Sequence, residues 1–291
     1  MSLMDTATDS WALAEAGFDR VVAAGKTDRG LTRERNEDQF VIAELTRALH
    51  IEASSLPQAE MLFGIGRVRG HLFIVADGMG GEEGGEEASA LAVTTIEDLL
   101  LRTLHWFFQL QGDAVLEEFQ LALRTADERI FEETRRQPAL RGMGTTVTLA
   151  YVVGRLLYVA HVGDSRCYLR RGEQLHQLTR DHTVVDELLQ QHVIDEETAR
   201  QHPMRHLITN SLGGPEPGVR PEVHRLPLEP GDMLLLCTDG LTEMVPQPEI
   251  ATTLASTGSP AEACDRLVAR ANELGGVDNV TVIVAKLDAG E

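Results

Sequence analysis

Cysteine is scarce in this sequence: Cys167, Cys237 and Cys264 are its only cysteines in 291 residues. The three lie far apart and form no C-x-x-C pair, which argues against a disulfide framework and against a zinc knuckle. Unpaired cysteines are typical of a reducing compartment, so we predict a cytoplasmic protein. Each cysteine is best interpreted as a small buried apolar side chain.

Long hydrophobic runs are also missing. The longest apolar stretches, residues 72–76, 233–237 and 280–285, have the length of a β-strand. A membrane-spanning helix needs about 18 or more apolar residues, so no membrane partner is expected. The acidic first residues lack the basic start and the apolar stretch of a secretory signal. We predict that residues 1–18 form a poorly ordered N-terminal extension.

Positive charge is in deficit, because 26 Lys and Arg residues face 46 Asp and Glu residues and leave a formal net charge of −20. A surface of this sign repels nucleic acid, so no nucleic-acid partner is expected. Two interpretations of the acidic excess stay open at this point. Either it keeps the protein in solution, or part of it holds cations.

Apolar patterning predicts eight strands and four helices. The strands are expected over residues 21–25, 39–43, 72–76, 145–153, 156–162, 166–170, 233–237 and 280–286, and the helices over residues 86–103, 114–136, 183–191 and 260–274. Tight turns at Gly154-Arg155 and at Arg171-Gly172 predict hairpins. Hairpin runs of strands with helices in blocks favour an α+β protein, with antiparallel sheets covered by helices.

No Pro/Gly/Ser-rich linker divides the chain, so one domain is expected over residues 19–288. Two stretches resemble insertions between elements. Residues 46–70 carry little periodicity, and residues 181–214 combine short helical pieces with turns. Plain surface decoration is the alternative interpretation of both stretches.

Acidic residues stand at the ends of several predicted strands, each beside Gly or a small polar residue. The five sites are Glu37-Asp38, Asp77-Gly78, Asp164-Ser165, Asp239-Gly240 and Asp278-Asn279. Asp is depleted in strands and favours turns, so any single site has a plain structural explanation. Five such sites in one chain are harder to explain by turns alone.

Carboxylates collected in one place would repel one another strongly. Two unit charges ~4 Å apart repel by about 4 kcal/mol at an effective dielectric of 20. Oxygen-rich clusters suit hard ions such as Mg²⁺ or Mn²⁺. Two such ions ~3.5–4 Å apart can activate a water and hold both oxygens of an in-line phosphoryl displacement. The acidic strand ends therefore indicate a two-metal site, provided that they converge in space.

Six short motifs follow one another along the chain. They are Arg33-Glu34-Arg35-Asn36-Glu37-Asp38, Asp77-Gly78-Met79-Gly80-Gly81, Gly144-Thr145-Thr146, Val162-Gly163-Asp164-Ser165-Arg166, Thr238-Asp239-Gly240-Leu241 and Asp278-Asn279-Val280-Thr281. In order and spacing the series resembles that of the metal-dependent serine/threonine protein phosphatases of the protein phosphatase 2C family, bacterial branch. The resemblance extends over roughly residues 18–287, nearly the whole chain.

The resemblance implies a four-layer αββα sandwich of two antiparallel β-sheets flanked by helices, with a flap subdomain at residues 181–214. It also implies two Mn²⁺ or Mg²⁺ ions in a cleft at one end, while Asp164 with Asp239 resembles the third-metal site of bacterial members. The implied metal ligands are Glu37, Asp77, Gly78 through its carbonyl, Asp164, Asp239 and Asp278, with Asp38 and Asn279 orienting ligands and waters.

Arg33 is the phosphate-binding residue that the resemblance implies, so Arg33, Asp77 and Asp239 form the predicted catalytic group. The planar guanidinium of Arg33 matches two phosphate oxygens. A surface ion pair with Glu34 or Glu37 is the alternative role for this arginine.

Met79 marks a departure from the animal members of the family, which carry histidine after Asp-Gly. Methionine cannot give a proton to the leaving group. A metal-bound water, His161 or His182 could supply that proton, although a structural role is the simpler interpretation of both histidines.

The activity that the resemblance implies is hydrolysis of phosphoserine and phosphothreonine in proteins by a metal-activated water, without a covalent phospho-enzyme. The alternative is a catalytically silent module of the same fold that binds phosphoproteins or a kinase. Loss of ligand positions would indicate that alternative. The expected partners are phosphorylated proteins, with a serine/threonine kinase among them, and the chain is expected to act in signalling as a monomer.

Overall fold

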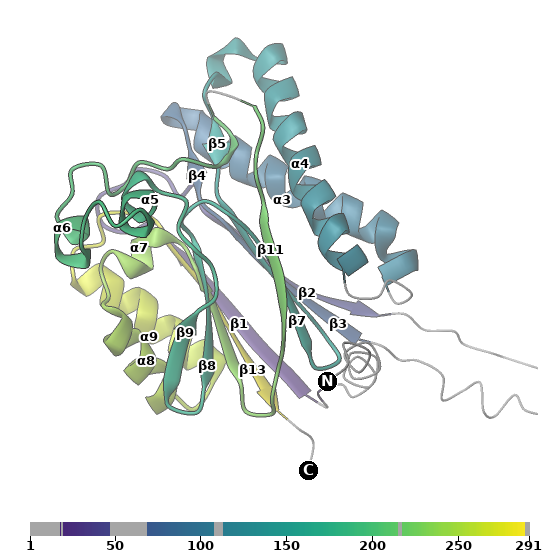
Figure 1. The fold of residues 1–291 in the computed structure, drawn as a ribbon, viewed down its shortest axis with the longest axis vertical. Helices are drawn as coiled ribbons and strands as arrows, with labels where there is room; N and C mark the ends of the chain where they lie inside the picture. Colours follow the sequence, from purple (N-terminus) through teal and green to yellow (C-terminus); the bar gives the residue numbers. More distant parts are fainter. Residues whose placement is uncertain (1–17, 19, 47–68, 108–112, 215–216, 289–291) are drawn as a thin grey trace, which may run out of the picture.

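The computed structural model describes residues 18, 20–46, 69–107, 113–214 and 217–288 (Figure 1). The predicted N-terminal extension over residues 1–18 lies outside the described residues except for Phe18. The predicted insertion over residues 46–70 lies outside them except at its two ends. Among the described helices, none combines the length and the apolar composition that a membrane crossing requires.

Two five-stranded antiparallel sheets form the centre of the described fold. The first, in spatial order, contains β1 (Arg20–Asp28), β13 (Val280–Asp288), β12 (Met233–Cys237), β8 (Arg166–Arg171) and β9 (Gln174–Gln177). The second contains β11 (Glu222–Pro227), β7 (Leu156–Val162), β6 (Val147–Val153), β3 (Arg69–Ala76) and β2 (Gln39–Thr46). A small third sheet contains β10 (Leu212–Gly213), β5 (Gly144–Thr145) and β4 (Gly78–Met79).

Strand β3 shows why its sequence reads as an unbroken apolar run. Leu72, Ile74 and Ala76 point to the helix-covered face of the second sheet, whereas Phe73 and Val75 point to the first sheet. Successive side chains of a strand face opposite sides, so a strand with both sides covered needs apolar residues at every position. The alternation of β3 side chains between the two faces becomes visible only once it is known that helices cover one face of the second sheet and the first sheet covers the other.

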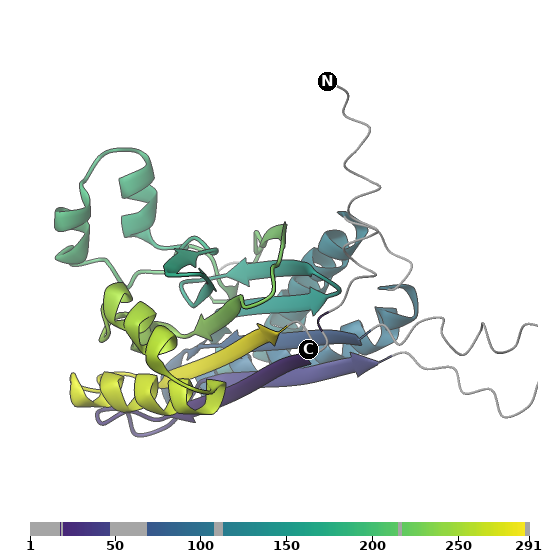
Figure 2. The same cartoon turned by 90° about the horizontal axis from the view of Figure 1, so that it is seen from below.

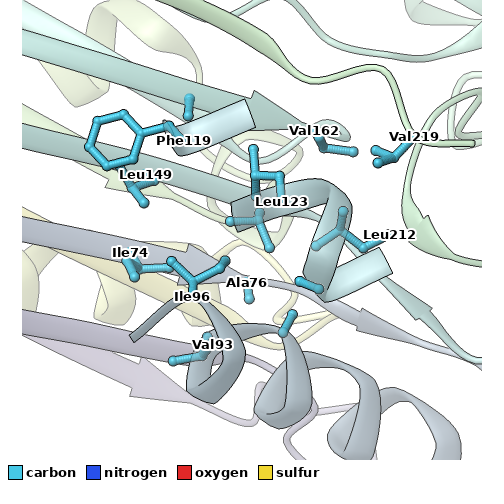
Figure 3. Close-up of a cluster of buried hydrophobic side chains, with 14 of the residues drawn as sticks. Ile74, Ala76, Val93, Ile96, Phe119, Leu123, Leu149, Val162, Leu212 and Val219 are labelled. Carbon is cyan, nitrogen blue, oxygen red and sulfur yellow. The ribbon is translucent and has the colours of Figure 1, made fainter. Parts of the chain in front are cut away.

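Helices cover the outer face of each sheet and complete four layers (Figures 1 and 2). Helices α3 (Gly81–Phe107) and α4 (Asp113–Arg136) pack on the second sheet, and the 3₁₀ turn η1 (Pro138–Leu140) follows them. Figure 3 shows Ile96 of α3 with Phe119 and Leu123 of α4 gathered over Ile74 and Leu149 of the sheet. Helices α7 (Asp239–Thr242), α8 (Gln247–Ser256) and α9 (Pro260–Glu273) cover the first sheet. The α+β sandwich of the sequence prediction is confirmed.

Helix α9 illustrates an element that local sequence signals define. Ser259 caps its N-terminus by accepting a hydrogen bond from the Glu262 amide at 3.2 Å, and Pro260 follows as the first helical residue. Ala263 and Leu267, four residues apart, are fully buried against the sheet. Burying a leucine contributes about 1.5–3 kcal/mol. The predicted helix over residues 260–274 ends one residue beyond the observed one.

The elements that the prediction missed include β9, β11 and α8. Strands β9 and β11 are the outer strands of the two sheets, and most of their side chains are partly or fully exposed. An edge strand with mixed polar residues carries no apolar run, so the sequence pattern does not reveal it. The β6–β7 turn lies at Gly154-Arg155 as expected, whereas the β8–β9 turn lies one residue later than expected, because Arg171 pairs with Gln174.

Residues 181–214, which we call the flap element, contain α5 (Val184–Gln190), α6 (Glu196–Arg200) and β10. Figure 2 shows its two short helices standing off one end of the sandwich. Three backbone contacts close its base: the His182 amide donates to the Gly163 carbonyl at 2.7 Å, the Thr209 amide donates to the His182 carbonyl at 2.8 Å, and Thr183 pairs with Ile208. The helix predicted over residues 183–191 corresponds to α5.

Candidate active site

The acidic strand-end motifs converge on one cleft with a volume of about 1100 Å³. Glu37 precedes β2, Asp77 follows β3, Asp164 lies between β7 and β8, Asp239 follows β12, and Asp278 precedes β13. Strands β2 and β3 are antiparallel neighbours, as are β12 and β13. The end of one strand therefore lies beside the start of its neighbour, and residues distant in sequence meet at one edge.

Eight of the nine predicted site residues line this cleft. They are Arg33, Glu37, Asp77, Gly78, Asp164, Asp239, Asp278 and Asn279. The ninth, Asp38, is buried at 3% exposure and does not line the cleft. Its Oδ2 accepts a hydrogen bond from the Thr238 hydroxyl at 2.9 Å, next to Asp239. This contact ties the start of β2 to the end of β12.

Asp77 is fixed by its backbone. Its amide donates to the Thr146 hydroxyl at 3.1 Å, and its carbonyl accepts from the Thr146 amide at 2.9 Å and from the Thr145 hydroxyl at 2.8 Å. The Thr146 hydroxyl also lies 2.7 Å from the Ser165 hydroxyl, beside Asp164. The two carboxylate-bearing loops are thus joined through one threonine.

The glycines that follow Asp77 and Asp239 allow close backbone approach. A Cβ on Gly78 would lie 2.1 Å from the Gly85 carbonyl oxygen, and a Cβ on Gly240 would lie 2.0 Å from the Asn279 carbonyl oxygen. Real side chains are never this close to another chain segment, so both positions require glycine. The Asp-Gly pairs therefore pack the acidic loops against their neighbours.

Asn279 joins the loop that carries Arg33 and Glu37 to the last strand. Its Nδ2 donates to the carbonyls of Arg29 and Arg35, each at 2.9 Å, and its Oδ1 accepts from the Glu37 amide at 2.8 Å. Each of these carbonyls and this amide belongs to the loop before β2. The side chain of Asn279 therefore holds that loop in place over the cleft.

The guanidinium of Arg33 lies over the acidic residues at the cleft. Its Nη2 donates to Asp278 Oδ2 at 2.6 Å, and its side chain remains 55% exposed. The pair differs from the surface pairs that the sequence suggested, which were with Glu34 or Glu37. The hydrogen bond that Arg33 donates to Asp278 is the main cause that raises the pKa of Arg33, and the charges of Asp77 and Glu37 add to it. Arg33 is thus a permanent cation at the entrance.

The cleft raises the pKa of its carboxyl groups. Removal from water is the first cause for Asp77, Asp164 and Asp239, whose pKa values are all raised above the usual range for Asp. Mutual repulsion is the next cause: Asp38 and Asp239 act on Asp77, and Asp239 acts on Asp164. Carboxylates held this close together are destabilised as anions unless a cation shares their field.

Two observations show that divalent cations fit these residues. Asp38 Oδ1, Asp164 Oδ1 and Asp239 Oδ1 are buried oxygens without a hydrogen-bond partner among the described residues. The carboxyl groups of Asp77, Asp164 and Asp239, which we call the floor of the cleft, offer oxygen atoms, the donors that Mg²⁺ and Mn²⁺ prefer. A cation in the cleft would satisfy the unpaired oxygens of Asp164 and Asp239 and would also relieve the repulsion between the carboxylates.

His161 and His182 do not line the cleft. His161 is fully buried, with Nδ1 at 2.8 Å from the Thr148 hydroxyl and Nε2 at 3.0 Å from the Gly163 carbonyl. Burial lowers the pKa of His161 to about 3 and that of His182 to about 4. Both rings are neutral structural groups, in agreement with the simpler interpretation of the sequence.

Three further residues of the cleft had no role in the sequence prediction. Thr146 belongs to the Gly144-Thr145-Thr146 motif, so its motif was visible although its contact with Asp77 was not. His206, in the flap element, and Glu243, just after α7, are in contact through His206 Nδ1 and Glu243 Oε1. One ligand-type atom of each of His206, Glu243 and Asp239 lies within 4.8 Å of the others. No sequence pattern marked His206 or Glu243.

Comparison with known protein families and sequences gives a consistent result. The family model described as Protein phosphatase 2C matches residues 50–273. The serine/threonine phosphatase Stp of Listeria monocytogenes is 34% identical over 263 residues, which cover 90% of this chain and 94% of that protein. The protein phosphatase PhpP of Streptococcus pneumoniae is 37% identical over 221 residues, 75% of this chain and 86% of that protein.

Solved structures show the same likeness. The crystal structure of the serine/threonine phosphatase PstP/Ppp of Mycobacterium tuberculosis superposes with a TM-score of 0.75 at 35% identity, covering 92% of this chain and 99% of that one. The PstP catalytic domain in complex with two manganese ions gives a TM-score of 0.71 at 33% identity, covering 92% and 98%.

Proposed function

The chain belongs to the protein phosphatase 2C family, and on that premise we propose how its cleft hydrolyses phosphoserine and phosphothreonine in proteins. It is a metal-dependent serine/threonine protein phosphatase, as its relatives are named. The observation that carries the residue assignment is the convergence of Glu37, Asp77, Asp164, Asp239 and Asp278 on one cleft, with Arg33 at its entrance.

The metal ligands that we propose follow from the unpaired oxygens and the acidic cleft. Two Mn²⁺ or Mg²⁺ ions would be held by Asp77, Asp239, Asp278, Glu37 and the carbonyl of Gly78, and a third ion would be held by Asp164 with Asp239. When bound, the ions would lower the pKa of a water enough for it to lose a proton and act as the nucleophile at neutral pH. Asp38 and Asn279 support this set from behind through Thr238 and the loop before β2.

Arg33 is the residue that we assign to the substrate phosphate. Its guanidinium has five N–H donors, and one of them donates to Asp278. The remaining donors can bind two phosphate oxygens side by side at the cleft entrance. A fixed positive charge there also offsets the negative charge that spreads over the phosphoryl oxygens during transfer.

The biological setting is part of the same proposal. Phosphorylated proteins are the substrates that the named relatives indicate. That a serine/threonine kinase is among them is our own proposal. Cys167, Cys237 and Cys264 are all free and buried, which supports a cytoplasmic location. A signalling role and a monomeric state stay predictions, which a phosphoproteome comparison and size-exclusion chromatography would test.

The direct test measures phosphate release from a phosphothreonine peptide with Mn²⁺ and then with EDTA. We expect turnover with Mn²⁺ and none with EDTA, and we expect Arg33→Ala to raise the KM for the peptide at least about tenfold, since a charge-assisted pair contributes ~1.5–3 kcal/mol. Arg29→Ala is the matched control, because Arg29 lies in the same loop and does not line the cleft. Peptide binding without phosphate release would favour the silent binding module instead.

A further inference from the structure

The departing oxygen of a serine or threonine needs a proton, because a free alkoxide is a poor leaving group. Met79 lines the cleft directly after Asp77-Gly78, and its thioether has no proton to give. We propose that His206 of the flap element is the general acid that protonates this oxygen. The inference rests on the proposed function, since it concerns the same cleft and the same reaction.

Position separates His206 from the other histidines. Among the histidines whose side chains the structure describes, His206 is the one that lines the cleft. His161 and His182 are buried, and His182 Nδ1 accepts from the Gly163 amide at 3.0 Å. Neither ring can reach a substrate without breaking the hydrogen bonds that hold it in the interior.

The contacts of His206 orient its ring. Nδ1 contacts Glu243 Oε1, so Nε2 is the nitrogen that remains for a substrate. The side chain of His206 is 44% exposed and that of Glu243 is 27% exposed, which places the pair at the mouth of the cleft. Glu243 therefore acts as a positioning residue that orients the His206 ring, as carboxylates commonly do beside a functional imidazole.

In-line displacement explains why the mouth is the correct side. The attacking water starts from the acidic floor, where Asp77 and Asp239 lie. The oxygen that leaves phosphorus departs on the opposite side, toward solvent. His206 lies on that side, yet one of its atoms is within 4.8 Å of carboxylate oxygens of both Asp239 and Glu243. A proton donor at the mouth would therefore face the departing oxygen and would not displace the carboxylates of the floor.

A bond forms from the water oxygen to phosphorus while the bond from phosphorus to the seryl or threonyl oxygen breaks. That oxygen takes the proton from Nε2 of His206, and the proton of the attacking water passes to solvent. The ring recovers a proton from solvent through the open mouth. Inorganic phosphate and a free hydroxyl are the products.

The test compares two leaving groups in His206→Asn with Mn²⁺ bound. A general acid contributes about 10²–10⁴-fold, so we expect kcat for a phosphothreonine peptide to fall at least about 100-fold. p-Nitrophenyl phosphate releases a weakly basic phenolate that needs no proton, and we expect its kcat to change by less than about threefold. Glu243→Gln should lower peptide turnover in the same direction by a smaller factor.

His192→Asn is the matched control, because His192 is an exposed residue of the flap element that does not line the cleft. We expect it to leave both activities unchanged, and we expect His206→Asn to keep the melting temperature and the calorimetric Mn²⁺ affinity. An equal loss on both substrates, or no loss on the peptide, overturns the role of His206. A wild-type protein inactive on both substrates would instead overturn the proposed function.

Discussion

The carboxylates at the floor of the cleft stand on the ends of sheet strands, whereas His206 stands on a turn of the flap element. β3 and β12 each lie between two hydrogen-bonded neighbours. Asp77 directly follows β3, and Asp239 follows β12 after Thr238. The flap element has two short helices, one isolated bridge and a few backbone contacts at its base. The floor is therefore held by the whole sandwich, whereas the flap element joins the sandwich through a few contacts, among them His182 with Gly163 and β10 with β5.

Side-chain contacts sharpen the difference between the two regions. Beside the floor, the Thr238 hydroxyl donates to Asp38, 200 residues away in sequence, and accepts from the Thr281 amide at 3.0 Å. These two hydrogen bonds join β2, β12 and β13. At the flap element, Arg166 forms a bidentate pair with Asp181, whose contacts are 2.5 Å and 2.8 Å and partly exposed. Metal ions need ligands that are fixed in position. The flap element, which we call the rim of the cleft, can change in conformation or sequence without disturbing such ligands.

The largest effect is expected at the floor, in Asp239→Asn. We propose Asp239 as a shared metal ligand, so its loss should remove several kcal/mol of transition-state stabilisation, and kcat should fall about 10³-fold or more. Circular dichroism should show an intact fold. Substantial residual activity would mean that Asp239 does not hold a metal. Substitutions at the floor would then be tolerated as well as substitutions in the flap element.

The same variant should be more stable than the wild type when metal is removed, and less stable than the wild type when metal is bound. Burial and repulsion raise the pKa of Asp239 from 3.8 to about 7, so the folded protein binds the proton more tightly than the unfolded chain. The contribution of Asp239 to the free energy of unfolding is then favourable at low pH, and it is lost as pH rises from 3.8 to about 7. In EDTA, Asp239→Asn should melt above the wild type, by more at pH 8 than at pH 5, and the order should reverse in Mn²⁺. A lower melting temperature in EDTA at pH 8 would contradict the crowding of carboxylates.

A smaller effect is expected from Gly240→Ala, which tests the backbone packing of the floor. The new Cβ would lie 2.0 Å from the Asn279 carbonyl oxygen, and relieving that overlap should cost about 1–3 kcal/mol of the free energy of unfolding. Gly258→Ala is the control, since its Cβ would meet the flexible end of Glu262 at 3.6 Å. Urea denaturation measures both, and equal stabilities would show that α7 can shift freely.

The smallest effect is expected in the flap element, from Thr183→Ala. Thr183 caps α5 by accepting from the Asp186 amide at 3.2 Å, and loss of such a cap costs about 1 kcal/mol. We expect amide exchange in α5 to accelerate about fivefold, while exchange in β3 and β12 and turnover of p-nitrophenyl phosphate stay unchanged. An equal acceleration in the central strands would show that both regions unfold as one unit.

The sequence predicted more of the floor than of the rim. Asp77, Asp239 and Asp278 follow or precede apolar strands, so both their element and their chemistry were visible in the pattern. Thr146 and Asp38 act through contacts with residues 69 and 200 positions away, which no local pattern encodes. The edge strands β9 and β11 were missed because half-exposed strands carry no apolar run.

The amino-acid sequence by itself determined the strands that are buried on both sides, the caps of α9, and the number and order of the acidic turns. These depend on neighbours within a few residues, where side-chain size, periodicity and backbone freedom act directly. Only the tertiary structure decided that Arg33 pairs with Asp278 and that His206 meets Glu243 at the cleft. Such pairs arise from how two sheets and a flap element close upon one another, because packing brings together residues whose separation along the chain carries no information about distance.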